Sequence, residues 1–103
     1  MKLEYYPLKK LKKEIIDIVG KHLDLSAYRV FFFGSRVTGK GDERSDIDVG
    51  IEGPAAVPSR AMIEILWAIE RLHTLYKIDV VDMRRVSPGF YRVAKEKIEN
   101  VAR

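Results

Sequence analysis

The stretch YRVFFFGSRVTGKGDERSDIDVGIE, residues 28–52, contains the clearest indications of how this chain folds. Its first six residues form a nearly continuous apolar run rich in β-forming side chains, which is typical of a short buried strand. Residues 34–44 contain three glycines and several charges but no apolar run, so they predict a loop with at most a short helix after Ser35. From Asp46 to Glu52 polar and apolar residues alternate, and this alternation predicts a second strand whose apolar side chains face one way.

Helices and one further strand are expected on either side of this stretch. Apolar residues at steps of three and four predict a helix from Pro7 to about Leu25, and another that Ser59 caps and that extends to about Tyr76. Residues 78–83 predict a third strand. Ser87 and Pro88 fit the cap and first position of a last helix. The apolar stripe of that helix would be Tyr91, Ala94, Ile98 and Val101.

This order of elements predicts an α/β (α+β) fold in which helices pack against a small sheet of three strands. The first two strands are joined by a loop and the next two by a long helical segment, so we expect a mixed sheet rather than an all-parallel one. With 103 residues the chain has room for one core, and residues 1–103 are expected to form a single domain.

The composition narrows the class of protein. A content of 47% hydrophobic and 33% charged residues is typical of a globular chain. The absence of cysteine excludes disulfides and thiolate metal sites. No segment has the length of a signal-peptide core or of a membrane span, so we expect a cytoplasmic protein that makes no membrane contact.

Two carboxylates share one face of the second predicted strand. Asp46 and Asp48 lie two residues apart, so their side chains leave the same face about 7 Å apart along the backbone. Like charges held this close repel each other unless a cation lies between them. Carboxylate oxygens suit Mg²⁺, which completes its octahedron with waters and substrate phosphates. Taken alone, however, an Asp-x-Asp pair is more often the solvent face of an edge strand.

The Gly34-Ser35 pair changes this balance. Glycine permits a positive φ and a close backbone approach, and exposed amides ahead of a short helix bind anions. The serine hydroxyl can add a hydrogen bond to a phosphate oxygen. Because ten residues separate Ser35 from Asp46, the combination brings phosphate-binding amides beside metal-binding carboxylates. The whole pattern therefore favours a nucleotide site over a turn followed by a polar strand.

The pattern of Gly34-Ser35, ten residues and Asp46-Ile47-Asp48 resembles the signature of the DNA polymerase β-like nucleotidyltransferase superfamily. The additional Arg36, Gly39 and Ser45 are similar to the minimal nucleotidyltransferase (MNT) branch of that superfamily. The resemblance extends to the length of the chain and to the order of its elements. It implies the nucleotidyltransferase fold and transfer of a nucleoside monophosphate from a nucleoside triphosphate to a hydroxyl.

The resemblance also implies a metal site with a third carboxylate on a later strand. Asp46 and Asp48 would contact two Mg²⁺ ions, and the third carboxylate would contact the ion that activates the acceptor hydroxyl. Asp79 and Asp82 are the two candidates, and they face opposite sides of a regular strand. We choose Asp79 because it lies among apolar neighbours, where a charge is costly without a cation. Asp82 is the reserve, since solvent or a helix cap would satisfy it near the strand end.

The loop supplies the expected phosphate contacts. By resemblance, the nucleotide-binding residues are Gly34, Ser35 and Arg36. Lys40 and Arg44 lie in the same loop, where neutralisation of pyrophosphate and an ordinary solvated position are equally good interpretations.

The target of the transfer is expected from resemblance alone. MNT proteins typically pair with a small helical HEPN protein as antitoxin and toxin, and some add AMP from ATP to a tyrosine of that partner. The resemblance therefore implies an ATP- and Mg²⁺-dependent protein adenylyltransferase that acts as an antitoxin. Ile63 and Trp67 lie outside the inward stripe of their helix, as on a partner-binding face. Coverage by the last helix explains these two residues equally well.

Three alternatives stay open. The first is a non-catalytic antitoxin or regulatory binding subunit, and the second transfers a nucleotide to a small molecule that a partner subunit binds. The third is a nucleic-acid binder, for which a solvated helix face is the preferred explanation of the basic cluster. That cluster is Lys9, Lys10, Lys12 and Lys13. His22 and His73 have no spaced partner and are expected to be helix-face residues rather than metal ligands.

Overall fold

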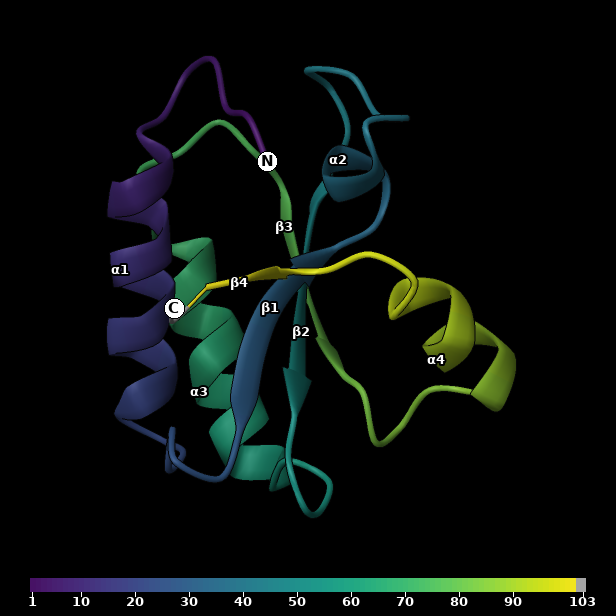
Figure 1. Ribbon diagram of the computed structural model, residues 1–103. Helices are drawn as coiled ribbons and strands as arrows, with labels where there is room; N and C mark the ends of the chain where they lie inside the picture. Colours follow the sequence, from purple (N-terminus) through teal and green to yellow (C-terminus); the bar gives the residue numbers. More distant parts are fainter. Residues whose placement is uncertain (102–103) are drawn as a thin grey trace.

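The computed structural model describes residues 1–101, which form a mixed sheet with helices on both faces (Figure 1). The sheet has the strand order β3-β2-β1-β4. Strand β1 runs antiparallel to both β2 and β4, whereas β2 and β3 are parallel. The elements are α1 (Leu8–Gly20), β1 (Arg29–Phe33), α2 (Ser35–Thr38), β2 (Ile47–Glu52), α3 (Ser59–Glu70), β3 (Ile78–Asp82), α4 (Pro88–Ala94) and β4 (Glu99–Asn100). The predicted mixed sheet is thus confirmed, with a fourth strand that was not expected.

The fourth strand replaces the second half of the predicted last helix. Ser87 does cap α4, since its side chain accepts a hydrogen bond from the Phe90 amide and Pro88 follows at the first helical position. The helix ends at Ala94, however, and Glu99–Asn100 pairs with β1. The amide of Val101 then donates to the carbonyl of Val30 at 3.0 Å. Covering the free edge of β1 in this way satisfies backbone groups that a longer helix would leave open.

Helices α1 and α3 are shorter than predicted. Helix α1 ends at Gly20 rather than near Leu25, because an Asx turn follows in which the Ser26 amide donates to Asp24 at 2.9 Å. Helix α3 ends at Glu70 rather than near Tyr76, and residues 71–77 return the chain to β3 through turns. Pro58, not Ser59, occupies the cap position of α3. None of the helices among residues 1–101 is long and apolar enough to cross a membrane.

The two faces of the sheet carry separate cores. Figure 1 shows α1 and α3 against one face and α4 on the other. The larger core lies under α1 and α3, where the alternate strand residues Phe32 and Val49 are fully buried. The smaller core lies under α4 and contains Phe31, Phe33 and Met83. Strand β1 is therefore buried on both faces, as its continuous apolar run predicts.

The separation of the two faces explains the exposure of Ile63 and Trp67 and the direction of the Asp48 side chain. Because α4 lies on the opposite face from α3, coverage by the last helix does not explain the apolar residues of α3. Ile63 stays 48% exposed and Trp67 59% exposed. In β2, Ile47 and the other apolar residues point toward α1 and α3, so Asp48 points toward the α4 side.

Candidate active site

The turn after β1 brings the backbone against a carboxylate. Gly34 has a φ of +83°, a conformation that side-chain-bearing residues rarely adopt. A Cβ atom at this position would lie 2.2 Å from Oδ2 of Asp48. Both the backbone conformation and the space therefore require glycine here.

Helix α2 starts at this glycine. Its first internal hydrogen bonds run from the amides of Val37 and Thr38 to the Gly34 carbonyl, each at 3.1 Å. The amides of Ser35 and Arg36 thus lie ahead of the helix's own hydrogen bonds, where an anion can accept from them. This is the short helix that the sequence allowed after the apolar strand.

Asp48 occupies the centre of the site. Its register partner in β1 is Phe33, the residue before Gly34, and its register partner in β3 is Asp79. Burial raises the pKa of Asp48, and the negative charges of Asp79 and Asp46 raise it further. Asp48 is half-buried while Asp79 is exposed. The cross-strand pair is thus an acidic site in which a cation would relieve the repulsion.

Asp46 lies one residue before the start of β2. Its Oδ2 is 3.9 Å from the Nζ of Lys77, and its side chain is 42% exposed. An exposed pair at this distance contributes little to stability. Asp46 is close enough to raise the pKa of Asp48, but it is also in reach of Lys77, the residue before β3.

The acidic residues form an open site rather than a closed metal cage. Within residues 1–101, no three His, Asp or Glu side chains are gathered closely enough to hold a metal ion by themselves. This arrangement suits Mg²⁺, which is commonly bound by one or two carboxylates together with waters and substrate phosphates. The donor set of hard carboxylate oxygens fits the same ion.

A cleft of about 520 Å³ joins the acidic pair to the loop. Gly34, Ser35, Asp48 and Asp79 line one side of it. The opposite wall comes from α4 and the segment after it, and it consists of Phe90, Val93, Ala94, Glu96 and Lys97. Four of the six residues that the sequence indicated for the site therefore meet in one cleft. Asp46 and Arg36 are outside its lining.

The guanidinium of Arg36 contacts the loop instead. Its Nε donates to the carbonyl of Ser45 at 2.7 Å, and its Nη2 donates to the carbonyl of Glu43 at 2.8 Å. It also stacks over the ring of Tyr76, with the guanidinium carbon 4.7 Å from the ring centroid. The phosphate contact expected for Arg36 stays a prediction, and the geometry favours a role in supporting the loop.

The two candidates for the third carboxylate lie on opposite faces of β3, as expected. The burial expected for them is wrong, because Asp79 is exposed and Asp82 is only 6% exposed. Asp82 accepts hydrogen bonds from the amides of Val57 at 2.7 Å and Arg84 at 2.9 Å, and it forms an ion pair with Arg85. Its oxygens are thus engaged in holding the turn before α3. Only Asp79 lines the cleft.

The far wall of the cleft was not indicated by the sequence. Phe90 and Val93 are 45% and 66% exposed, and Phe90 packs edge-on against Phe33 with ring centroids 6.0 Å apart. Lys97 lines the same wall and faces a cleft that also contains Lys40. These residues have no motif of their own, because only the packing of α4 across the sheet brings them to the site.

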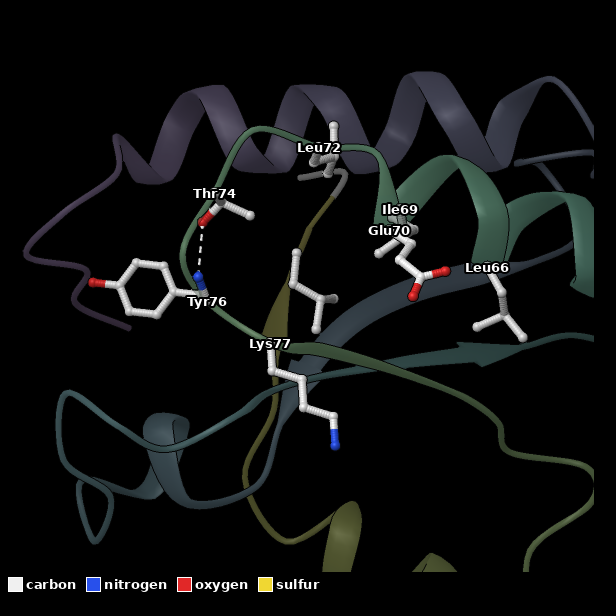
Figure 2. Close-up of a pocket in the computed structure, with 8 residues that line it drawn as sticks. Leu66, Ile69, Glu70, Leu72, Thr74, Tyr76 and Lys77 are labelled. Atoms are coloured by element: carbon white, nitrogen blue, oxygen red, sulfur yellow. Dashed lines mark hydrogen bonds between the residues drawn. The ribbon is translucent and has the colours of Figure 1, made fainter.

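A second, smaller pocket of about 300 Å³ lies between the end of α3 and the start of β3 (Figure 2). Leu66, Ile69 and Leu72 give it an apolar lining, and Tyr76 and Lys77 form its other side. It contains one acidic residue, Glu70, and neither the Gly34 turn nor the acidic pair. The features that suit phosphate and metal binding, the Gly34 turn and the acidic pair, therefore lie in the cleft beside α4 and not in this pocket.

Comparison with known proteins shows which folds and which family this chain resembles. No curated protein sequence matches the chain. In fold the chain is similar to a chain of a toxin–antitoxin crystal structure with AMP-PNP, at a TM-score of 0.63, 19% identity, and coverage of 87% of this chain and 71% of that one. It is similar also to a chain in the complex of tri-AMPylated Shewanella oneidensis HEPN toxin with MNT antitoxin, at a TM-score of 0.64, 18% identity, and coverage of 90% and 71%. A chain of the MntA–HepT toxin–antitoxin gives a TM-score of 0.62 at 18% identity, with coverage of 87% and 68%.

The family model described as "Polymerase beta, Nucleotidyltransferase" matches residues 13–100, which include β1, the Gly34 turn and all four candidate carboxylates. Because that match spans most of the chain, the protein belongs to the polymerase β-type nucleotidyltransferase family.

Proposed function

We propose that this protein is a Mg²⁺-dependent nucleotidyltransferase that moves AMP from ATP to a tyrosine hydroxyl of a HEPN-type partner and thereby acts as an antitoxin. The observation that carries the proposal is the cleft in which the Gly34-Ser35 turn meets Asp48 and Asp79. Membership of the nucleotidyltransferase family supports the reaction class. The fold neighbours support the substrate and the target, since one contains AMP-PNP and another a tri-AMPylated HEPN toxin.

Different residues at the cleft would bind the phosphates, bind the metal ions and neutralise the pyrophosphate. The turn at Gly34 and Ser35, through the amide and the hydroxyl of Ser35, would hold the β- and γ-phosphates. Asp46, Asp48 and Asp79 would hold two Mg²⁺ ions. Bound Mg²⁺ supplies neutralisation of the phosphates and lowers the pKa of the acceptor hydroxyl. Lys40 and Lys97 line the cleft and would offset the charge of the departing pyrophosphate.

The transfer itself is an in-line displacement at the α-phosphorus. The acceptor oxygen forms a bond to that phosphorus, the bond to the bridging α,β-oxygen breaks, and pyrophosphate leaves. The proton of the acceptor hydroxyl passes to the Asp79 carboxylate, which is exposed at the cleft and within reach of an incoming side chain. The exposure of Asp79 thus suits contact with a protein acceptor.

We further propose that residues 1–103 form a single nucleotidyltransferase domain that works in the cytoplasm. The acceptor would come from a partner, because α4 and the loop leave the cleft open to one side and no described element covers it. The exposed Ile63 and Trp67 on α3 are consistent with a protein partner but do not identify one.

A mass-spectrometric experiment tests this function. The purified protein is incubated with ATP, Mg²⁺ and a HEPN protein encoded beside it, and the partner's peptides are mapped. We expect addition of AMP to a tyrosine, and no addition with the Asp46→Asn, Asp48→Asn double variant. An unmodified partner that is nevertheless neutralised would identify a binding antitoxin instead. AMP on an added small molecule would identify transfer to a small-molecule acceptor instead.

A further inference from the structure

We propose that Arg36 and Tyr76 form a positioning clamp that fixes the Asp46 carboxylate for the divalent cation. The proposal rests on the metal-dependent function proposed above and assigns to this pair the part of the site that the cleft lining leaves out. Arg36 and Tyr76 are positioning residues in it, since neither lines the cleft.

The first half of the clamp is the fork of Arg36. Its Nε and Nη2 donate to two carbonyls of the loop, those of Ser45 and Glu43, while a longer contact of 3.5 Å reaches the carbonyl of Lys2. A planar guanidinium can make these bonds together and stack on a ring, whereas a lysine ammonium offers a single point charge. Arg36 thereby connects α2 to the segment that ends at Asp46.

The second half is Tyr76, which lies in the turn before β3. The guanidinium of Arg36 stacks on its ring at 4.7 Å, and its hydroxyl accepts from the amides of Glu4 and Tyr5, each at 3.1 Å. The amide of Tyr76 donates in turn to Thr74 within the same turn (Figure 2). Three segments far apart in the sequence are therefore joined at this one ring.

The clamp holds Asp46 from both sides along the chain. On the N-terminal side, the carbonyl of Ser45 accepts from Arg36. On the C-terminal side, the amide of Ile47 donates to the carbonyl of Lys77, the residue after Tyr76, at 2.9 Å. The side chain of Lys77 also lies 3.9 Å from the Asp46 carboxylate. The backbone on either side of Asp46 thus depends on the Arg36–Tyr76–Lys77 connection.

This geometry explains how a carboxylate before the strand can be placed as firmly as one within it. Asp48 is fixed by its pairing to β1 and β3, but Asp46 precedes β2 and lacks that ladder. Groups that orient a metal-binding side chain typically change metal affinity by about 10- to 100-fold when they are altered. We expect a loss of this size when the clamp is broken.

The test measures loop order and metal affinity without any transfer reaction. Amide hydrogen exchange is followed over residues 42–47, and Mn²⁺ binding is measured by paramagnetic resonance. In Arg36→Lys we expect faster exchange in this segment with unchanged exchange in α1 and β1, and a dissociation constant for Mn²⁺ raised about 10-fold or more. Tyr76→Leu should reproduce both effects. Arg71→Lys, an exposed arginine at the end of α3, serves as the matched control and should behave as the wild type.

The variant Tyr76→Phe distinguishes the role of the Tyr76 hydroxyl from the role of its ring. This variant keeps the stacked ring, so Mn²⁺ affinity should change less than about 3-fold while the amides of Glu4 and Tyr5 exchange faster. A large loss of Mn²⁺ affinity in Tyr76→Phe would contradict the assigned role of the ring.

Steady-state kinetics of Arg36→Lys can contradict the clamp proposal. If Arg36 contacts phosphate directly, Arg36→Lys raises the KM for ATP while loop exchange and Mn²⁺ affinity stay at wild-type values, and the clamp proposal is overturned. If the wild type transfers no AMP to any acceptor, the proposed function fails, but the exchange and Mn²⁺ measurements still decide on the clamp.

Discussion

At the scale of single residues, Asp48 combines a close contact with the Gly34 backbone, a position opposite Asp79 and partial burial. Burial and the negative charges of Asp79 and Asp46 raise the free energy of its charged form. A group whose pKa is raised in the folded state binds its proton more tightly there than in the unfolded chain. The ionised carboxylate therefore lowers stability at pH values above the raised pKa, and the penalty disappears as the pH falls below the carboxyl's ordinary range.

Asp48→Asn should stabilise the fold and abolish function. In EDTA at pH 7 we expect a Tm up to about 5 °C higher than that of the wild type, since about 1 kcal/mol corresponds to roughly 4–8 °C in a domain of this size. Near pH 3 the two proteins should melt together. AMP transfer should fall at least about 100-fold. Thermal melts at the two pH values check the sign, and a lower Tm for the variant at pH 7 would show that the charge is not destabilising.

Asp79 and Asp82 should give opposite results when each is changed to alanine. Asp82→Ala leaves the buried amide of Val57 without its acceptor, which costs about 1–3 kcal/mol of unfolding free energy, and transfer by the folded protein should stay near the wild-type rate. Asp79→Ala should leave stability nearly unchanged and reduce transfer at least about 100-fold. Urea unfolding combined with transfer assays distinguishes the two. A strong loss of transfer in Asp82→Ala alone would make it the third carboxylate.

The placement of Asp46 and Asp48 near Gly34 can be predicted from the sequence, whereas the exposure of Asp79 and the contacts of Arg36 cannot. The spacing of Asp46 and Asp48 and their distance from Gly34 follow from strand alternation and the turn. The exposure of Asp79 could not be predicted, because it depends on β3 being the edge strand of the sheet. The contacts of Arg36 depend on Tyr76, forty residues later in the chain, and no local pattern reveals such a contact.

At the scale of elements, α4 determines the shape of the cleft. Glu52 at the end of β2 accepts hydrogen bonds from the Tyr91 hydroxyl and from Lys95, the latter at 2.5 Å. Burial alone would raise the pKa of Glu52, but the bonds from Lys95 and Tyr91 and the charge of Arg29 lower it on balance. The attachment is therefore present above the ordinary pKa of a glutamate and is lost as the pH falls through the lowered value.

Neither the position of α4 nor the strand β4 could be predicted from the sequence, because both depend on tertiary packing. Tyr91, Ala94, Ile98 and Val101 have a spacing that suits a helix, yet Ile98 packs in the smaller core and Val101 in the larger one. Side chains that reach opposite faces of the sheet belong to an extended segment, and only tertiary packing distinguishes the two cases.

Lys95→Met should loosen α4 and weaken nucleotide binding. Because Lys95 does not line the cleft, we expect the KM for ATP to rise several-fold while kcat changes less than about 2-fold. Steady-state kinetics measure the two constants, and Lys13→Met, on the exposed surface of α1, is the control. An unchanged KM would mean that α4 is held in place without this ion pair.

Across the whole molecule, the sheet separates the larger hydrophobic core from the cleft. The face under α1 and α3 carries the larger core, and the face under α4 carries the cleft (Figure 1). Since the chain supplies few covering elements on the cleft side, bound nucleotide and metal should contribute a substantial share of its stability. Ligand binding to the folded state alone stabilises it by about 2.7 kcal/mol at 100 times the dissociation constant.

Mg²⁺ with an α,β-methylene analogue of ATP should therefore raise the Tm by roughly 10–20 °C at such concentrations. Neither ligand alone should reach this value, because the metal site needs phosphate oxygens to complete it. Scanning calorimetry of the wild type and of the Asp46→Asn, Asp48→Asn double variant measures the effect. An equal shift in both proteins would place the nucleotide away from these carboxylates.

The proposed function requires Asp46 and Asp48 to support Mg²⁺-dependent transfer of AMP. The most direct measurement is the rate of label incorporation into the HEPN-type partner from ATP labelled at the α-phosphate, with ATP labelled at the γ-phosphate in parallel. We predict incorporation of the α-label only, dependence on Mg²⁺, and loss of at least about 100-fold in Asp48→Asn. Incorporation at the wild-type rate by Asp48→Asn would contradict the role assigned to Asp48. Transfer of the γ-label would contradict transfer of AMP.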